Sequence, residues 1–403
     1  PYPKYDTNSG FELIIKARDY NFFGTMSALR LDLGYKYDEN NRNSVVFEID
    51  TDTPFTALGY NWNVNFDHSF NYRPDAAEPY YYKNVTGLSV DLPLKKTTFT
   101  FGFEESFTLN EENADRYRDN YGEFQNGLYT TSEFFGSWKI PTGFNAGDYG
   151  ELTYTPRIST VFNHGFSEWP LDEFRLGPFM NLGQTLGFNR INWIENYREG
   201  FDVSADNSYT LDFHRTENGR DILDLDYSIS GIGHFIISDS FGISTRLRFR
   251  QWFYSDPEYH NSAGDALRGI LDRAVHADYM LSLNLDFPVR LFRFTPSRWF
   301  RQDWMRFFDF EMHFSPVIDL ALYHDPSSGT SFDFKNILVS GGAELIVFPA
   351  FMRSLYIRAS IAWNLREYIN SPSGSYLPSG LPVIPKLPGG DNREIFIGIG
   401  HHY

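Results

Sequence analysis

The side chains in this sequence that could catalyse a reaction fall into no known catalytic pattern. The spacings HExxH, CxxC and GxSxG and the phosphate-binding P-loop are all missing, so the usual signatures of metal, redox, nucleophilic and phosphate chemistry are absent. His401 and His402 are adjacent, and on a strand they would point to opposite faces rather than share a metal. Asp224 and Asp226 could form a carboxylate pair, but charge pairing in water with the arginine-rich segment 246–250 is the better interpretation. We therefore expect no enzymatic activity, no cofactor and no metal site.

A second candidate lies in the stretch GDALRGILDR, residues 264–273, where Leu267, Arg268, Gly269 and Ile270 follow one another. Taken alone, this motif is a turn glycine beside a solvated arginine. A functional role depends on the elements that surround the motif.

Charge and composition limit the class of protein. The chain of 403 residues has 35 Lys and Arg against 52 Asp and Glu, a formal net charge of −17, and no cysteine. Nucleic-acid binding needs a basic face, so a general nucleic-acid binder is excluded. The lack of cysteine is compatible with an oxidising compartment. No stretch approaches the roughly 18–20 consecutive apolar residues of a spanning helix, which excludes a helical membrane protein.

Strict alternation of apolar and polar residues recurs from one end of the chain to the other. The clearest case is YNWNVNFDHSFNY at 60–72, where large apolar side chains alternate mainly with Asn, Asp and Ser. A period of two indicates a strand whose two faces meet different surroundings. The same pattern predicts strands at 98–104, 221–229, 242–250, 279–287 and 308–314.

The contrast between the two faces indicates a membrane. The polar faces carry charges of both signs at mid-strand, and aromatic residues make up 18% of the chain, more than one core between two sheets could use. Both observations fit strands that turn apolar residues to lipid and charged residues to a wet lumen. The sequence therefore predicts an all-β fold, a transmembrane antiparallel β-barrel of about sixteen strands closed between its first and last strands. The final strand ends in the aromatic Tyr403, and a terminal strand of this kind is typical of bacterial outer-membrane barrels.

Several segments resemble the Omp85 superfamily of BamA-like barrels, and they occur in the family's order. Leu267-Arg268-Gly269-Ile270 resembles the aliphatic-Arg-Gly-aromatic tetrad of the long sixth extracellular loop, here 255–277, with Ile270 at the aromatic position. Residues 9–35 resemble the family's first hairpin, with Asn21–Thr25 as its short loop. Five strand-like segments follow the motif, as in the family, at 279–289, 307–323, 339–349, 354–363 and 395–403.

This resemblance implies that the loop lies inside the barrel and that Arg268 pairs with carboxylates of the inner wall. Strand parity makes Asp286 and Asp319 the expected partners, provided that Pro316 leaves the register unbroken. Glu344 is a weaker third partner.

The resemblance also implies a weak seam between the first and last strands, which opens and templates an incoming strand. The seam residues are Phe11 and Leu13 on the first strand, and Ile395, Ile397, Gly398, Ile399, Gly400 and Tyr403 on the last. The two glycines either soften the last strand or fit a neighbour inside the lumen.

We expect residues 1–10 to be a linker from an upstream periplasmic domain and residues 11–403 to be one barrel. Family insertases carry POTRA modules before the barrel, whereas PYPKYDTNSG leads straight into the first strand. The expected function is assembly or translocation of outer-membrane proteins through the seam. Its expected partners are outer-membrane lipids, unfolded outer-membrane proteins, and periplasmic or lipoprotein accessory subunits. A plugged outer-membrane pore or transport barrel, and a membrane anchor for a missing soluble domain, stay open as alternatives.

Overall fold

A computed structural model describes most of the chain. The described residues are 2–7, 10–22, 27–37, 43–74, 80–109, 128–145, 147, 150–166, 177–213, 223–253, 266–271, 275, 277–325, 328–351, 356–366 and 393–399. Gly400, Tyr403, part of the predicted short loop at 21–25 and much of the predicted loop 255–277 lie outside these ranges.

Strands dominate the described residues. They are β1 (Tyr2–Asp6), β2 (Gly10–Phe22), β3 (Ser27–Tyr37), β4 (Asn43–Ala57), β5 (Tyr60–Tyr72), β6 (Tyr80–Leu94), β7 (Thr97–Leu109), β8 (Leu128–Asn145), β9 (Glu151–Gly165), β10 (Phe179–Ile194), β11 (Tyr197–Asp212), β12 (Leu223–Ser238), β13 (Phe241–Phe253), β14 (Tyr279–Asp286), β15 (Val289–Phe294), β16 (Phe310–His324), β17 (Leu338–Pro349), β18 (Ile357–Asn364) and β19 (Arg393–Ile399). Within the part of the chain that the structure describes, the helical segments are α3 (Pro296–Phe300), η5 (Asp303–Phe308) and η6 (Phe334–Asn336). Within the described ranges, no helix is both long and apolar enough to cross a membrane.

The pairing of the strands confirms the predicted fold class. All nineteen belong to one sheet with antiparallel pairing, and β1 pairs with both β19 and β2, which is the connectivity of a closed antiparallel barrel. The count exceeds the predicted sixteen partly because residues 2–6 form a strand. It also rises because a further strand, β15, begins just after Phe287 and Pro288, where the predicted strand at 279–289 ends, and follows β14 along β16. Proline interrupts the strand because it has no N–H to donate to the ladder.

The chain divides into two compact units, the first of which comprises residues 1–3, 9–187 and 205–226. Its strands β2 to β9 pair with their neighbours in sequence. The alternating segment 60–72 is β5, as predicted, and it pairs along its length with β4 and β6. The tight turn Leu58–Gly59 joins β4 to β5, and the tight turn Lys95–Lys96 joins β6 to β7 at the same end of the strands.

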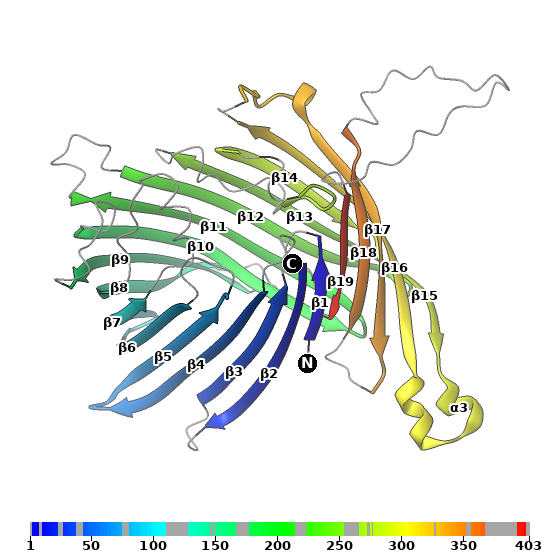
Figure 1. Cartoon of the computed structure of the whole chain (residues 1–403), viewed down its shortest axis with the longest axis horizontal. Coiled ribbons are helices and arrows are strands. Elements are labelled where there is room, and N and C mark those ends of the chain that lie inside the picture. Colours follow the sequence, from blue (N-terminus) through cyan, green and yellow to red (C-terminus); the bar gives the residue numbers. More distant parts are fainter. Residues whose placement is uncertain are drawn as a thin grey trace. The chain divides into compact units, whose positions relative to one another are not determined.

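The second unit comprises residues 4–8, 188–204 and 227–403. Its strands β16, β17, β18 and β19 lie side by side (Figure 1) and pair in that order. The register from β16 to β17 runs without interruption through Pro316, which pairs with Ala343. Inward and outward positions therefore alternate along the whole of β16.

The faces of β16 are reversed relative to a soluble protein. The buried positions include the polar residues Glu311, His313 and Asp319, whereas Phe314 and Ile318 are exposed. A strand in water would bury its apolar face and solvate its charges. This reversal is the pattern that the sequence predicted for strands with a polar interior.

Residues 2–6, which the sequence indicated as a linker, form the strand β1. Lys4, Tyr5 and Asp6 pair with Gly398, Ile397 and Phe396 of β19. The Thr7 N–H also donates to the Ile395 carbonyl at 3.2 Å. The last described strand is therefore covered by a strand of only five residues.

Candidate functional site

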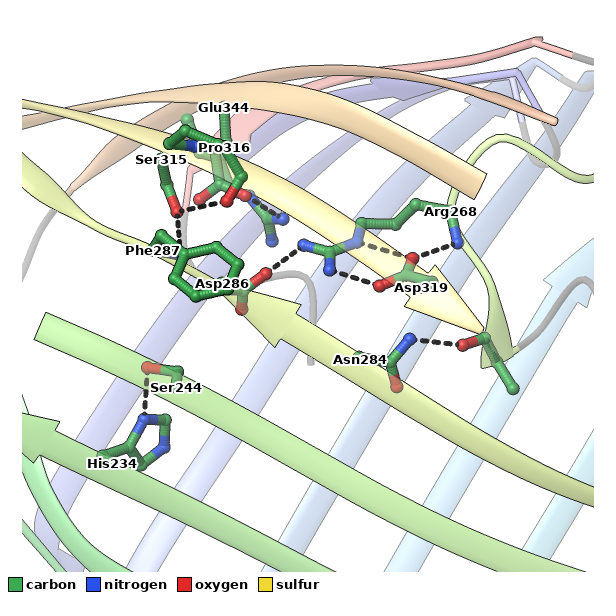
Figure 2. A network of polar contacts seen from close by, with 12 residues as sticks. His234, Ser244, Arg268, Asn284, Asp286, Phe287, Ser315, Pro316, Asp319 and Glu344 are labelled. Atoms are coloured by element: carbon green, nitrogen blue, oxygen red, sulfur yellow. Dashed lines mark hydrogen bonds and ion pairs between the residues drawn. The ribbon is translucent and has the colours of Figure 1, made fainter. Parts of the chain in front are cut away.

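Arg268 binds two carboxylates from two different strands. Its Nε lies 2.9 Å from Oδ2 of Asp319 and its Nη2 lies 2.5 Å from Oδ1, so the guanidinium grips this β16 carboxylate with two parallel hydrogen bonds (Figure 2). The remaining Nη1 lies 2.5 Å from Oδ1 of Asp286 on β14. The backbone N–H of Arg268 also donates to Asp319, at 2.8 Å. A planar guanidinium suits such two-sided binding, which the point charge of lysine could not reproduce.

Burial makes this contact structurally important. The side chains of Arg268 and Asp319 are 3% and 1% exposed, whereas that of Asp286 is 31% exposed. A buried charge that loses its partner is strongly destabilising, because neither water nor another charge replaces the contact. Arg268 is therefore a fixed element of the interior, not a solvated surface residue.

Gly269 lets the loop backbone pass against the wall. Its φ is +83°, and a Cβ built there would lie 2.6 Å from the Trp363 nitrogen and 2.8 Å from the Ala362 carbonyl carbon, both on β18. Backbone atoms of a paired strand cannot move aside, so only glycine fits this position. The Gly269 N–H donates to Oε2 of Glu394 on β19 at 2.9 Å.

The apolar residues of the motif complete the attachment. Leu267 and Ile270 are 1% and 0% exposed, and they pack into a buried cluster with Ala266, Ala277, Met280, Ala321, Tyr323 and Leu338. Asn284 Nδ2 donates to the Ala266 carbonyl at 2.8 Å, which holds the entry to the motif against β14 (Figure 2). Each residue of the tetrad thus has a defined place, and Ile270 fills the apolar position where the family pattern has an aromatic ring.

The chain is similar to solved structures, but it matches no family model and no curated protein. Among solved structures, the chain is similar to BamA from Haemophilus ducreyi lacking POTRA domains 1–3, with 12% identity and a TM-score of 0.48 over 99% of this chain and 69% of that chain. It is similar to CdiB from Acinetobacter baumannii, with 11% identity and a TM-score of 0.46 over 93% of this chain and 59% of that chain. CdiB from Escherichia coli matches at 12% identity and a TM-score of 0.43, over 88% of this chain and 59% of that chain. The chain thus spans less than two thirds of both CdiB chains.

Two of the three predicted partners contact Arg268, and the third contacts a different arginine. Asp286 and Asp319 contact Arg268, whereas Glu344, the predicted third partner, forms its ion pair with Arg358 on β18. The Arg358 guanidinium also lies over the ring of Phe396, 5.3 Å from its centroid. Glu344 therefore belongs to a second buried ion pair beside the Arg268 site.

On β19 the predicted seam residues separate by face. Gly398 is buried, on the same face as Glu394 and Phe396, whereas Ile397 is exposed on the opposite face, which Ile395 and Ile399 share. A Cβ at Gly398 would lie 2.9 Å from the Phe396 ring, so this glycine makes room for an inward neighbour. On β2, the predicted residues Phe11 and Leu13 pair with Tyr37 and Tyr35 of β3.

Three residues of the site were not identified from the sequence, namely Asn284, Arg358 and Glu394. Parity was the available signal for all three, because each alternates with apolar residues on its strand. Among the described residues, no group of three or more His, Asp or Glu side chains could hold a metal ion.

A cavity of about 130 Å³ adjoins the site on the side of Asp286. Its lining includes Trp193, Tyr197, His234, Asp286 and Arg358. His234 Nδ1 lies 2.7 Å from the Ser244 hydroxyl (Figure 2). The lining is mainly apolar, and Asp286 is among its polar groups. Asp286 is therefore the member of the Arg268 site that faces open space.

Proposed function

We propose that this chain is an Omp85-type outer-membrane barrel that inserts or translocates β-barrel proteins through a lateral seam. The observation that carries the proposal is the buried Arg268 motif, which contacts four strands of the second unit. Arg268 binds β14 and β16, while Gly269 lies against β18 and donates to β19. A loop fixed in this way occupies the polar side of the strands, as the family resemblance implies.

The reversed faces of the strands support an outer-membrane location. On β16 the buried side carries Glu311, His313 and Asp319, and the opposite side exposes Phe314 and Ile318. Apolar side chains on the outer side of paired strands are stable in lipid, where closed pairing also satisfies the backbone groups. Outer-membrane lipids are accordingly the first partners that we propose.

The seam expected from the sequence lies between residues 11–17 and 395–403. Because β1 pairs with β19, the seam that we propose lies between β1 and β19. These strands share three residue pairs, whereas β16 and β17 share twelve. A short partner contributes few hydrogen bonds and little packing, so β1 is the strand that separates most easily from β19. The freed β19 edge would then present unpaired N–H and C=O groups to an unfolded outer-membrane protein.

The proposal extends to accessory components. Residues 1–10 would connect the barrel to an upstream periplasmic domain, even though residues 2–6 also form β1. Periplasmic or lipoprotein subunits would deliver substrates to the seam.

A reversible lock on the seam tests the proposal. Tyr5 and Ile397 are exposed register partners, and the chain has no native cysteine, so Tyr5→Cys with Ile397→Cys creates a single candidate disulfide. The matched control is Leu345→Cys with Ala359→Cys, which links β17 to β18 at another register pair. Each variant is reconstituted in liposomes, and insertion of a urea-denatured small barrel protein is followed with and without reductant.

We expect the oxidised seam lock to stop catalysed insertion, reductant to restore it, and the control lock to leave it unchanged. Equal insertion by the locked and unlocked seam would contradict the proposal. Ion conductance that rises on removal of Arg268, with no catalysis by any variant, would instead identify a plugged pore.

A further inference from the structure

The connection between β15 and β16 differs from its neighbours at the same end of the strands. Glu195–Asn196 and Asp239–Ser240 are tight turns between paired strands. The β15–β16 connection, residues 295–309, lies at this end, because Arg290 donates to the Ser240 carbonyl at 2.9 Å and Arg293 lies 3.4 Å from the Glu195 carboxylate. It forms α3 and η5 beyond the ends of the two strands (Figure 1).

This connection exposes an unusual density of aromatic rings. Trp299, Phe300, Trp304, Phe307 and Phe308 are between 55% and 65% exposed, and we call residues 295–309 with these rings the aromatic foot. Large apolar side chains gathered on a surface are unfavourable in water. A contiguous patch of this kind marks a site of interaction.

The aromatic foot has a defined structure. The Ser297 N–H and hydroxyl donate to the Asp309 carboxylate at 3.1 and 2.5 Å, and Ala350 donates its N–H to the Asp309 carbonyl at 2.8 Å. Phe307 packs against Phe351 of the β17–β18 connection, with ring centroids 5.3 Å apart. The exposed rings are therefore held in place before any partner binds.

The charge of the aromatic foot is opposite to that of the chain. Arg298, Arg301 and Arg306 are exposed, and the exposed acid Asp303 is already paired with Arg306 at 3.1 Å. The chain as a whole carries a net charge of −17. Guanidinium groups among tryptophan and phenylalanine rings match a phospholipid surface, where rings sit at the headgroup level and arginines bind phosphates.

The aromatic foot is also continuous with the apolar outer face of its two strands. Leu291 and Phe292 of β15 and Phe314 of β16 are exposed on that face. Phe294 connects them to the foot, because its ring lies 5.2 Å from Trp299 and 5.4 Å from Phe310. A lipid that covers the strands would meet the foot directly.

We propose that the aromatic foot inserts its rings into the phospholipid headgroup layer at the short-turn end of the strands, with Arg298, Arg301 and Arg306 binding anionic lipid phosphates. This inference rests on the proposed membrane location and adds a lipid-binding element to it. The charge pattern and the continuity with the strand face favour lipid over a protein partner.

Fluorescent labels at single introduced cysteines test the inference in the full chain. The label is attached at Gln302→Cys in the foot or at Ile318→Cys on the exposed face of β16. The labelled chains are reconstituted in phosphatidylcholine vesicles with and without phosphatidylglycerol. Brominated acyl chains on either lipid quench a label that lies near them.

We expect quenching at both labels, and stronger quenching at Gln302→Cys when the bromine is on phosphatidylglycerol. Replacing Arg298, Arg301 and Arg306 with Gln should reduce this preference by up to about fivefold per arginine, while quenching at Ile318→Cys stays unchanged. Quenching at Ile318→Cys without quenching at Gln302→Cys would overturn the aromatic foot alone and indicate a protein partner. No quenching at Ile318→Cys would instead overturn the membrane location. Quenching at Gln302→Cys with no lipid preference would overturn the arginine role.

Discussion

Gly269 donates its backbone N–H to the Glu394 carboxylate at 2.9 Å, and this bond joins the Arg268 loop to β19. The same strand pairs with β1 at the proposed seam, through Lys4, Tyr5 and Asp6. Glu394 is buried, so its carboxylate depends on such donors for stabilisation. A change in the pairing of β19 would therefore alter the hydrogen bond from Gly269, and release of the loop would alter the pairing of β19 with β1.

Replacing Glu394 with Ala should loosen both ends of this connection. The substitution removes the hydrogen bond from Gly269, and a hydrogen bond to a charged acceptor contributes about 1.5–3 kcal/mol. We expect faster hydrogen exchange at the Gly269 amide and at the amides of 395–399. Glu394→Gln keeps an acceptor oxygen and should exchange more slowly than the Ala variant. Unchanged exchange at 395–399 in the Ala variant would show that loop and seam are not coupled.

Replacing Arg268 with Ala should leave Asp319 buried without its cation. Loss of one member of a buried pair typically costs about 3–5 kcal/mol of unfolding free energy. Arg268→Lys should recover little of this loss, because lysine cannot bind Asp319 with two parallel bonds and also reach Asp286. Urea unfolding from lipid vesicles measures the effect.

The control for Arg268 is Arg30→Ala in the first unit. Arg30 pairs with Asp50 at 2.7 Å, but its side chain is 50% exposed. Exposed pairs contribute about 0–1 kcal/mol. Equal losses for the two alanine variants would contradict the structural role assigned to Arg268.

Parity explains how much of the site could be predicted from the sequence. Asp286 and Asp319 lie on the inner face because side chains alternate along a strand and Pro316 does not shift the register. A proline is tolerated within a strand only where its missing N–H is not needed. The inside-out faces were predictable for the same reason.

The partner of Glu344 could not be predicted, because parity assigns a face but not a neighbour across the sheet. Arg358 pairs in register with Ile346, and its guanidinium reaches diagonally to Glu344. Long side chains make such diagonal contacts freely. The Glu394 contact could not be predicted for another reason. Its donor is the backbone N–H of Gly269, in a loop far from Glu394 in the sequence, and side-chain parity does not indicate such a donor. Strand β1 was missed because Pro3 in its short sequence is typical of a linker.

Gly269→Ala should release the loop from β18. Gly329 serves as a control that separates the backbone strain of the substitution from the close contact with β18. Gly269 and Gly329 have φ values of +83° and +68°, so an alanine is strained at either position by roughly 1–2 kcal/mol. A Cβ at Gly329 meets nothing within 4 Å, whereas at Gly269 it would lie 2.6 Å from the Trp363 nitrogen. We expect Gly269→Ala to lose roughly 1–3 kcal/mol more unfolding free energy than Gly329→Ala, because the close contact adds to the strain. Gly269→Ala should also slow catalysed insertion in liposomes, whereas Gly329→Ala should not. Equal effects of the two substitutions on unfolding would mean that the contact between Gly269 and β18 does not hold the loop.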